Sequence, residues 1–146
     1  MDFDQMGQGE KVSLGGAAIT IVAAFLPWIT LGALGSVSGI DGDGTFTLIM
    51  GAIVAGIVVA REWENVDQLA TLALGVLVAG IGLMYVTDPA AGIDTGSEFG
   101  NQIVSEVVSP AVGVYLTLIG GVAITAGGAL GYFGDDTETQ PTQPAD

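Results

Sequence analysis

The sequence contains no cysteine and no histidine, and only two of its 146 residues are basic. Without cysteine the chain cannot form a disulfide, an iron–sulfur cluster or a thiolate zinc site. Without histidine it lacks the commonest general base and metal ligand. No nucleophile–base pair, phosphate-binding loop or basic nucleic-acid patch is recognisable. We therefore expect a non-enzymatic protein with no catalytic residues, no cofactor, no metal and no basic contact with nucleic acid.

Charge is also missing from four long stretches of the chain, residues 12–40, 44–60, 68–87 and 107–134. Each stretch is dominated by Ala, Val, Ile, Leu and Gly, and none contains an acidic or basic residue. A charge at the centre of a bilayer costs at least about 2.5–3.5 kcal/mol, whereas a water-soluble helix needs a polar outer face. The four stretches therefore predict a multi-pass integral membrane protein.

The predicted fold is all-α, an integral membrane four-helix bundle made by a single domain over residues 1–134. About 20 helical residues cross about 30 Å of hydrocarbon, which places the spans at about 13–34, 45–61, 68–87 and 110–133. Apolar residues at helical spacing after residue 98 predict a short interfacial helix before the last span. The acidic, proline-containing C-terminal tail, 135–146, is expected to be disordered.

Local signals predict where the spans begin and end. Pro27 and Trp28 indicate the exit of the first span, because proline ends helices and tryptophan prefers the headgroup level. Asn65 followed by Gln68 resembles a capping box that opens the third span. Pro110 is expected in the first turn of the last span.

Four residues are candidate anchors at the membrane interface, namely Lys11, Trp28, Arg61 and Trp63. Lys11 precedes the first span and Arg61 follows the second, so both fall on one side of a four-span protein. The positive-inside rule makes that side cytoplasmic. Both termini are then expected in the cytoplasm, or in the lumen of a virion that has budded from the cell.

Small residues recur at helix-packing spacing in the second and last spans. The candidate packing positions are Gly51, Ala55, Gly120, Ala123, Gly127 and Gly131. Helices in lipid associate by close approach through such residues, because burial of apolar surface does not drive them together there. These positions either pack the four helices of one chain or join copies of the chain, and the sequence leaves both readings open.

The acidic turn at residues 39–44 begins like a calcium-binding loop. An EF-hand would need glycine where Phe46 stands and an acidic residue where Ala52 stands, so that motif fails. We interpret Asp41 and Asp43 as part of an Asp-Gly turn. A divalent cation shared with other carboxylates on the same side stays an open alternative.

The chain carries 16 acidic residues against 2 basic ones, for a net charge of −14. The acids are spread over the loops and both termini, which suits molar salt, where the Debye length falls to about 3 Å. This composition is typical of a halophilic archaeon with high internal salt. An acidic membrane protein of a non-halophilic organism is the alternative.

Two short motifs carry a resemblance that extends over nearly the whole chain. Phe-Leu-Pro-Trp at 25–28 and Gly-Ile-Asp-Gly-Asp-Gly at 39–44, followed by an apolar span, resemble a group of small four-pass prokaryotic membrane proteins. The acidic composition is similar to that of its haloarchaeal members. Size, layout and acidic loops also resemble the internal envelope proteins of haloarchaeal pleomorphic viruses, the pleolipoviruses. That resemblance implies a matrix-like protein facing the virion lumen, with a viral spike protein or further copies of the chain as partners besides the lipid bilayer.

Three functional classes follow from these observations. The first is a structural protein of a viral envelope, and the second is a cellular haloarchaeal four-pass subunit or scaffold. The third, a small transporter or channel, is disfavoured because such proteins ordinarily place ionisable groups inside the membrane. We take the viral envelope protein as the leading hypothesis, because the chain is a minimal bundle without a predicted soluble domain.

The acidic composition generates the first prediction. The melting temperature of the purified protein should fall when salt is lowered from molar to physiological concentration, because the carboxylates then repel one another over a longer distance. Thermal unfolding followed by circular dichroism across a series of salt concentrations measures this. A melting temperature that does not change with salt would contradict the halophilic assignment.

Overall fold

The computed structural model describes residues 6–91, 93 and 95–134, so the tail at 135–146 lies outside the described residues. The described part forms five α-helices, and two of them are long and apolar enough to cross a membrane. The helices are α1 (Gln8–Ala24), α2 (Gly44–Ala60), α3 (Asn65–Thr87), α4 (Glu98–Val107) and α5 (Val112–Tyr132).

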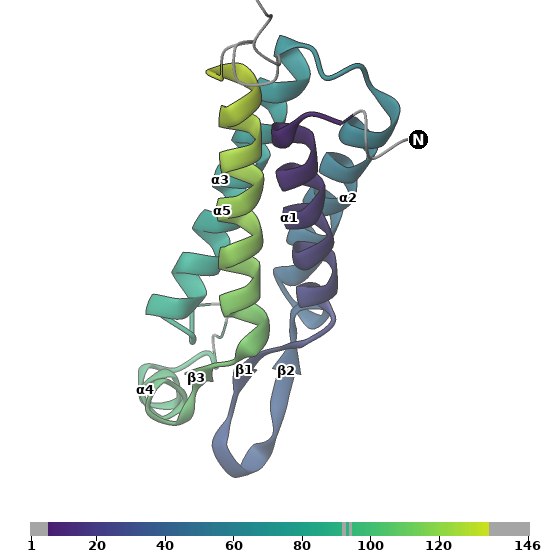
Figure 1. Cartoon of the computed structure of the whole chain (residues 1–146). Helices are drawn as coiled ribbons and strands as arrows, with labels where there is room; N and C mark the ends of the chain where they lie inside the picture. The colour runs from purple at the N-terminus through teal and green to yellow at the C-terminus, as the bar shows by residue number, and fades with distance from the viewer. Residues whose placement is uncertain (1–5, 92, 94, 135–146) are drawn as a thin grey trace, which may run out of the picture.

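Four of the helices, α1, α2, α3 and α5, lie side by side along a common axis (Figure 1). Helix α5 packs closely against both α1 and α3, α1 also packs against α2, and α2 touches α3 only lightly. The start of α1, the α2–α3 connection and the end of α5 meet at one end, which we call the Trp63 end. The opposite end carries a β-hairpin and α4, and we call it the hairpin end.

The hairpin end contains a small antiparallel sheet that the all-α prediction missed. Its strands are β1 (Pro27–Thr30), β2 (Ser36–Ser38) and β3 (Ser109–Pro110), in the order β2-β1-β3. Short 3₁₀ turns at Gly32–Leu34 and Gly39–Asp41 flank β2. The hairpin reverses through Gly32 and Gly35, whose φ angles of 63° and 106° are the left-handed values that glycine adopts without strain.

Helix α1 therefore does not extend over the whole of the predicted first span, 13–34. Helix α1 begins at Gln8 and stops at Ala24, because Pro27 has no N–H to donate within a helix and instead begins β1. The backbone N–H of Leu26 still donates to Ala23 O at 3.1 Å, as a last tight turn. The residues that follow pair into a hairpin, with Ile29 opposite Val37, which was not predicted from the sequence.

The other spans were placed within about one turn of the helices, but two of their start signals were wrong. At the start of α3, the N–H of Glu64 donates to Asp67 Oδ2 at 3.0 Å, so the cap lies one residue before Asn65 and uses a carboxylate. A carboxylate accepts a stronger hydrogen bond than a neutral amide does, which explains why Asp67 caps the helix in place of Gln68. Pro110 lies in β3, opposite Ile29, and α5 begins only at Val112.

The interior of the bundle is built on pairs of adjacent glycines in α5. Gly120 and Gly127 face α1, where a methyl group on each would lie 2.9 Å from Gly16 O and 2.7 Å from Gly9 O. Their neighbours face α3: a methyl group on Gly121 would lie 2.7 Å from Ala79 Cα, and one on Gly128 would lie 2.6 Å from Leu72 N. Since adjacent residues differ by about 100° around a helix, each pair presents one glycine to each neighbouring helix. The seven-residue repeat keeps both contacts in register along α5.

These contacts generate a packing prediction. Gly127→Leu should destabilise the protein by about 1–3 kcal/mol or more, because a side chain at this position overlaps the backbone and hydroxyl of Ser13. Gly80→Leu is the matched control, since Gly80 lies in the middle of α3 with no neighbouring atom within 4 Å of a Cβ at that position. Thermal unfolding of both variants in lipid bilayers measures the difference. Equal stability of the two variants would show that close packing at Gly127 is unimportant.

Candidate functional site: the outer apolar surface and the hairpin-end pocket

Large apolar side chains cover the outer faces of the bundle, and we call this surface the apolar belt. Its central members are each 46–56% exposed. They are Val22 of α1, Ile49, Ile53 and Val59 of α2, Leu69, Val76, Leu77 and Leu83 of α3, and Tyr115, Ile119 and Val122 of α5. Monomeric soluble proteins rarely expose so much continuous apolar surface, which marks a contact with protein or membrane.

The interior beneath this belt is small and partly polar. Fully buried hydroxyl side chains come from all four bundle helices, at Ser13, Thr20, Thr47, Thr71 and Thr117. Thr47 and Thr117 donate to the carbonyls of Gly44 and Gly113 on their own helices, at 2.9 and 2.8 Å. Among the described residues, the hydroxyls of Ser13, Thr20 and Thr71 have no hydrogen-bond partner. Such a distribution, with apolar residues outside and small or polar residues inside, reverses the usual pattern of a soluble protein.

Length and exposure distinguish the two longest helices from the core helices of a soluble domain. Helix α3 has 23 residues and α5 has 21, which correspond to about 34 and 31 Å at about 1.5 Å per residue. Only 28% of the most apolar 18-residue stretch of α3, and 44% of that of α5, is buried. A helix at the core of a soluble protein would be mostly buried. Helix α2 is a shorter apolar helix of 17 residues.

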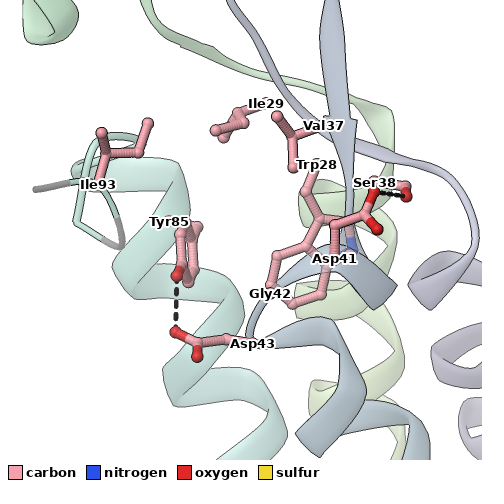
Figure 2. Close-up of a pocket in the computed structure, with 10 residues that line it drawn as sticks. Trp28, Ile29, Val37, Ser38, Asp41, Gly42, Asp43, Tyr85 and Ile93 are labelled. Atoms are coloured by element: carbon pink, nitrogen blue, oxygen red, sulfur yellow. Dashed lines mark hydrogen bonds between the residues drawn. The ribbon is translucent and has the colours of Figure 1, made fainter. Parts of the chain in front are cut away.

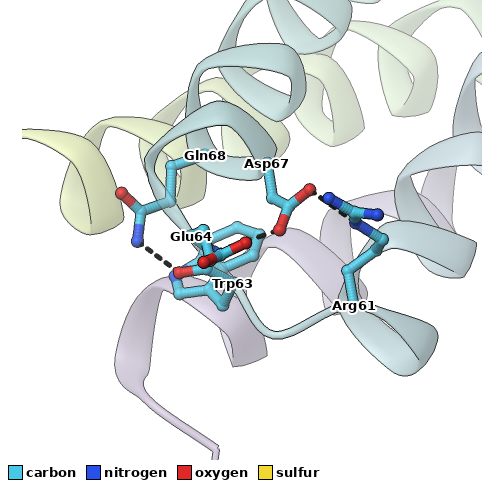
Figure 3. Close-up of polar contacts among 5 residues, drawn as sticks. All are labelled: Arg61, Trp63, Glu64, Asp67 and Gln68. Carbon is cyan, nitrogen blue, oxygen red and sulfur yellow. Dashed lines mark hydrogen bonds and ion pairs between the residues drawn. The ribbon is translucent and has the colours of Figure 1, made fainter.

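The two basic residues lie together at the Trp63 end. Arg61 follows α2 and its Nε donates to Asp67 Oδ1 at 2.9 Å, while its side chain stays 55% exposed (Figure 3). Lys11 lies in the first turns of α1 and is exposed. The hydrogen bond and the charge of Asp67 raise the pKa of Arg61 above its ordinary value. Both long side chains can therefore reach water or lipid headgroups.

Trp63 closes the same end from the loop between α2 and α3. Its indole lies against Gly131, where a Cβ would approach Trp63 Nε1 to 2.7 Å, and its carbonyl accepts a hydrogen bond from Gln68 Nε2 at 2.8 Å (Figure 3). Its φ of 60° is the only positive value of a non-glycine residue in the described part of the chain. A bulky residue in this conformation is strained, so the packing of its indole must offset that strain. Trp63 is only half-buried and stays a candidate interface anchor.

Trp28 does not fit the predicted role of interface anchor. Its side chain is only 3% exposed, and its Nε1 donates to Ala23 O at 3.0 Å. The indole packs at 5.3 Å from the ring of Tyr85, edge to face, within a cluster that includes Ile29 and Val114. A side chain that is enclosed by protein cannot lie among headgroups, so Trp28 instead joins the hairpin to the ends of α3 and α5.

The six predicted packing positions lie at different kinds of contact. Gly120 and Gly127 face α1, Gly131 lies under Trp63, and Gly51 faces Thr20 and Ile21 of α1. The side chain of Ala123 lies beside Gly16, and Ala55 packs against the cluster of Val54, Val58 and Ile124. All six therefore make contacts inside one chain. The glycines at 121 and 128 were missed, although the repeated Gly-Gly pairs seven residues apart were visible in the sequence.

The hairpin end contains a partly open pocket of about 120 Å³ (Figure 2). The hairpin, the acidic turn at 41–43, the end of α3 and Ile93 form its walls. The hydroxyl of Tyr85 donates to Asp43 Oδ2 at 2.6 Å, and that of Ser38 donates to Asp41 Oδ2 at 2.9 Å. The motifs at 25–28 and 39–44 thus meet at one place. No group of three or more potential metal-ligating side chains occurs in the part of the chain that the structure describes.

The chain matches no protein-family model, no curated protein and no solved structure.

Proposed function

We propose that the protein is a non-enzymatic structural membrane protein in which α1, α2, α3 and α5 all cross the bilayer. The observation that carries this proposal is the apolar belt around an interior of small and hydroxyl-bearing residues. Lipid hydrocarbon would shield the apolar belt from water, as a protein core shields the apolar face of a helix in a soluble protein. Small residues inside allow the close helix approach on which association in lipid depends.

The two shorter helices support the same arrangement. Helices α1 and α2 have 17 residues each, or about 25 Å at about 1.5 Å per residue, near the lower limit for a span. Both lie alongside the longer helices in the bundle (Figure 1). Glu10 and Lys11 stand in the first turns of α1, where long side chains can reach the headgroups.

Helix α4 is the candidate interfacial helix. Its exposed apolar residues Phe99, Ile103 and Val107 follow one another at four-residue spacing on one face, while Gln102 and Glu106 lie on another. Figure 1 views α4 nearly end-on while the bundle helices are seen from the side, so α4 runs across the bundle axis. A helix with one apolar face and this direction suits the plane of the membrane surface.

The charge distribution supports one orientation. Lys11 and Arg61 are the chain's only basic residues. Lys11 lies in the first turns of α1 and Arg61 directly follows α2, and both segments lie at the Trp63 end (Figure 1). By the positive-inside rule this end faces the cytoplasm, with both termini, and the hairpin end faces outward. In a virion budded from the cell the Trp63 end would face the lumen.

Within this class we propose the narrower role of an internal, matrix-like envelope protein of a haloarchaeal pleomorphic virus. The resemblance in size, layout and acidic loops to the internal envelope proteins of these viruses, and the minimal bundle with short loops, support it. A viral spike protein or further copies of the chain would be its partners in the lipid bilayer. A cellular haloarchaeal subunit or scaffold is the competing assignment, and it shares the same membrane architecture.

Membrane crossing can be tested with single cysteines, because the native chain contains none. Ser36→Cys reports on the hairpin end, Glu62→Cys on the Trp63 end and Val76→Cys on the middle of α3, and all three positions are exposed in the structure. In sealed vesicles of known orientation, a membrane-impermeant maleimide should label the first two from opposite sides and should leave Val76→Cys unlabelled. Denaturation in detergent should make all three reactive.

The Val76→Cys variant decides the result. Water surrounds position 76 if the belt is a soluble surface, and labelling would then proceed as fast as at Glu62→Cys. Labelling of Ser36→Cys and Glu62→Cys from the same side would contradict the proposed four crossings even if Val76→Cys stayed protected.

The viral assignment has a separate test. A producing haloarchaeal culture is separated in high salt on a density gradient, and the protein is quantified by mass spectrometry in cell membranes and in released particles. We expect strong enrichment in particles together with a spike protein. Confinement to the cell membrane fraction would reject the viral role and favour the cellular scaffold.

A further inference from the structure

The cavity at the hairpin end has walls that come from four separate segments, and glycines make room for them. A Cβ on Gly39 would overlap the indole of Trp28 and would lie 2.9 Å from Ala24 O. A Cβ on Gly44 would overlap the backbone of Gly39. The turn at 39–44 therefore lies directly against Trp28, and the cavity opens beside this contact.

Hydrogen bonds fix the polar groups of the cavity. Tyr85 holds Asp43 through one carboxylate oxygen, at 2.6 Å, and Ser38 holds Asp41 in the same way, at 2.9 Å. The Tyr85 ring is itself held edge to face against Trp28. Figure 2 shows Asp43, Tyr85 and Trp28 around the same space, with Ile29, Val37 and Ile93 on its far side. The pocket thus combines two carboxylates with aromatic and aliphatic walls.

The electrostatic environment favours a positively charged occupant. Both basic residues of the chain lie at the opposite end of the bundle, so no basic side chain neutralises Asp41 or Asp43. Asp88, at the end of α3, adds a further carboxylate at this end. The start of α2 contributes only about half a positive charge, which the two full charges of Asp41 and Asp43 exceed. Together these charges concentrate cations at the cavity.

The walls select among cations. A calcium ion takes six to eight oxygen ligands, whereas most of the residues that line this cavity are apolar. A methylated ammonium group combines a positive charge with an apolar surface, and aromatic rings within about 6 Å attract it. The size is of the right order, because an apolar cavity of about 150 Å³ holds benzene and this partly open pocket of about 120 Å³ can take most of a group of similar size.

We propose that the hairpin-end pocket binds a small methylated ammonium group between the carboxylates of Asp41 and Asp43 and the rings of Trp28 and Tyr85. The group belongs either to a free organic cation or to the headgroup of a lipid, since both present the same chemistry. The proposal depends on the geometry of the pocket and is independent of whether the protein is viral or cellular.

Tetramethylammonium chloride is the probe, and Trp28 is the reporter. Trp63→Phe leaves Trp28 as the only tryptophan, because the chain contains two. The protein is purified in a maltoside detergent, and tetramethylammonium replaces sodium at constant ionic strength so that screening is equal in all samples. We expect a saturable change in Trp28 fluorescence. A change that rises linearly without saturation would overturn the proposal.

Two carboxylate variants and one control locate the binding. In the Trp63→Phe background, Asp43→Asn should weaken binding about tenfold or more, because it removes a full charge from a half-buried position. Asp41 is exposed, so Asp41→Asn should weaken binding by a smaller factor, about two- to fivefold. Asparagine at 43 retains an oxygen that accepts from Tyr85, and an unchanged melting temperature verifies that the fold is intact. Asp41→Asn gives an independent result if Asp43→Asn does not fold. Glu62→Gln, at the opposite end, should leave the affinity unchanged, and equal affinity in all variants would place the binding elsewhere.

Reconstitution distinguishes the two sources of the group. In vesicles of phosphatidylglycerol at molar ionic strength, where the negative charge of the lipid surface is screened within about 3 Å, the tetramethylammonium affinity should match that in maltoside at the same ionic strength. If a lipid headgroup is the natural occupant, phosphatidylcholine vesicles should weaken the apparent affinity by competition, and a free cation is indicated if they do not. Loss of saturable binding in phosphatidylglycerol as well as in maltoside would reject the site, whatever the cysteine labelling shows about membrane crossing.

Discussion

The close approach of three helix backbones along α5 is the constraint on which the rest of this structure depends. Gly120 and Gly127 admit α1 on one side of α5, and Gly121 and Gly128 admit α3 on the other. No larger residue fits at these positions without moving a neighbouring backbone. Since both pairs repeat after seven residues, the contacts persist over nearly two turns and fix the direction of all three helices. Helix α2, which lacks such a double contact, packs mainly against α1.

Because the helix backbones lie in contact inside the bundle, there is little room for large side chains there, and these side chains point outward. The interior consists of glycine, alanine, serine, threonine and a few β-branched residues such as Val54 and Ile124, while leucine, isoleucine and valine project from the surface. In water this arrangement would expose the belt and gain little from burial. In lipid the apolar belt contacts hydrocarbon and is not exposed to water. The interior then stabilises the bundle through dispersion contacts between closely spaced backbones. The same pattern, with small residues facing the neighbouring helices and large apolar residues facing outward, therefore favours both close helix packing and a lipid environment.

The sequence was sufficient to predict α2, α3 and α5 to within about one turn, because long uncharged stretches carry a strong signal and the ends near residues 60 and 87 are fixed by charge and proline, but it did not give the bounds of α1. It was insufficient for the hairpin end. The pairing of Ile29 with Pro110 joins residues far apart in the chain, and no local pattern specifies that. The pairing of Ile29 with Val37 is local, but it was missed because residues 29–34 were assigned to the first span. Trp28 looked like an interface anchor because its position beside Pro27 is typical of one. Its burial follows instead from Gly39 and Gly113, two glycines whose missing side chains make room for the indole.

The two ends of the bundle differ chemically, because both basic residues of the sequence lie at the Trp63 end. At the Trp63 end, Arg61 pairs with Asp67, and the strained backbone of Trp63 is held by its packing over Gly131. At the hairpin end, within the described part of the chain, the carboxylates of Asp41 and Asp43 accept hydrogen bonds from hydroxyl groups alone, those of Ser38 and Tyr85. A hydroxyl fixes a carboxylate without neutralising it, so the negative charge remains available to a cation. Both basic residues thus lie at the end that the positive-inside rule would place in the cytoplasm if the chain crosses the membrane as proposed, and the opposite end keeps an uncompensated negative charge that attracts cations.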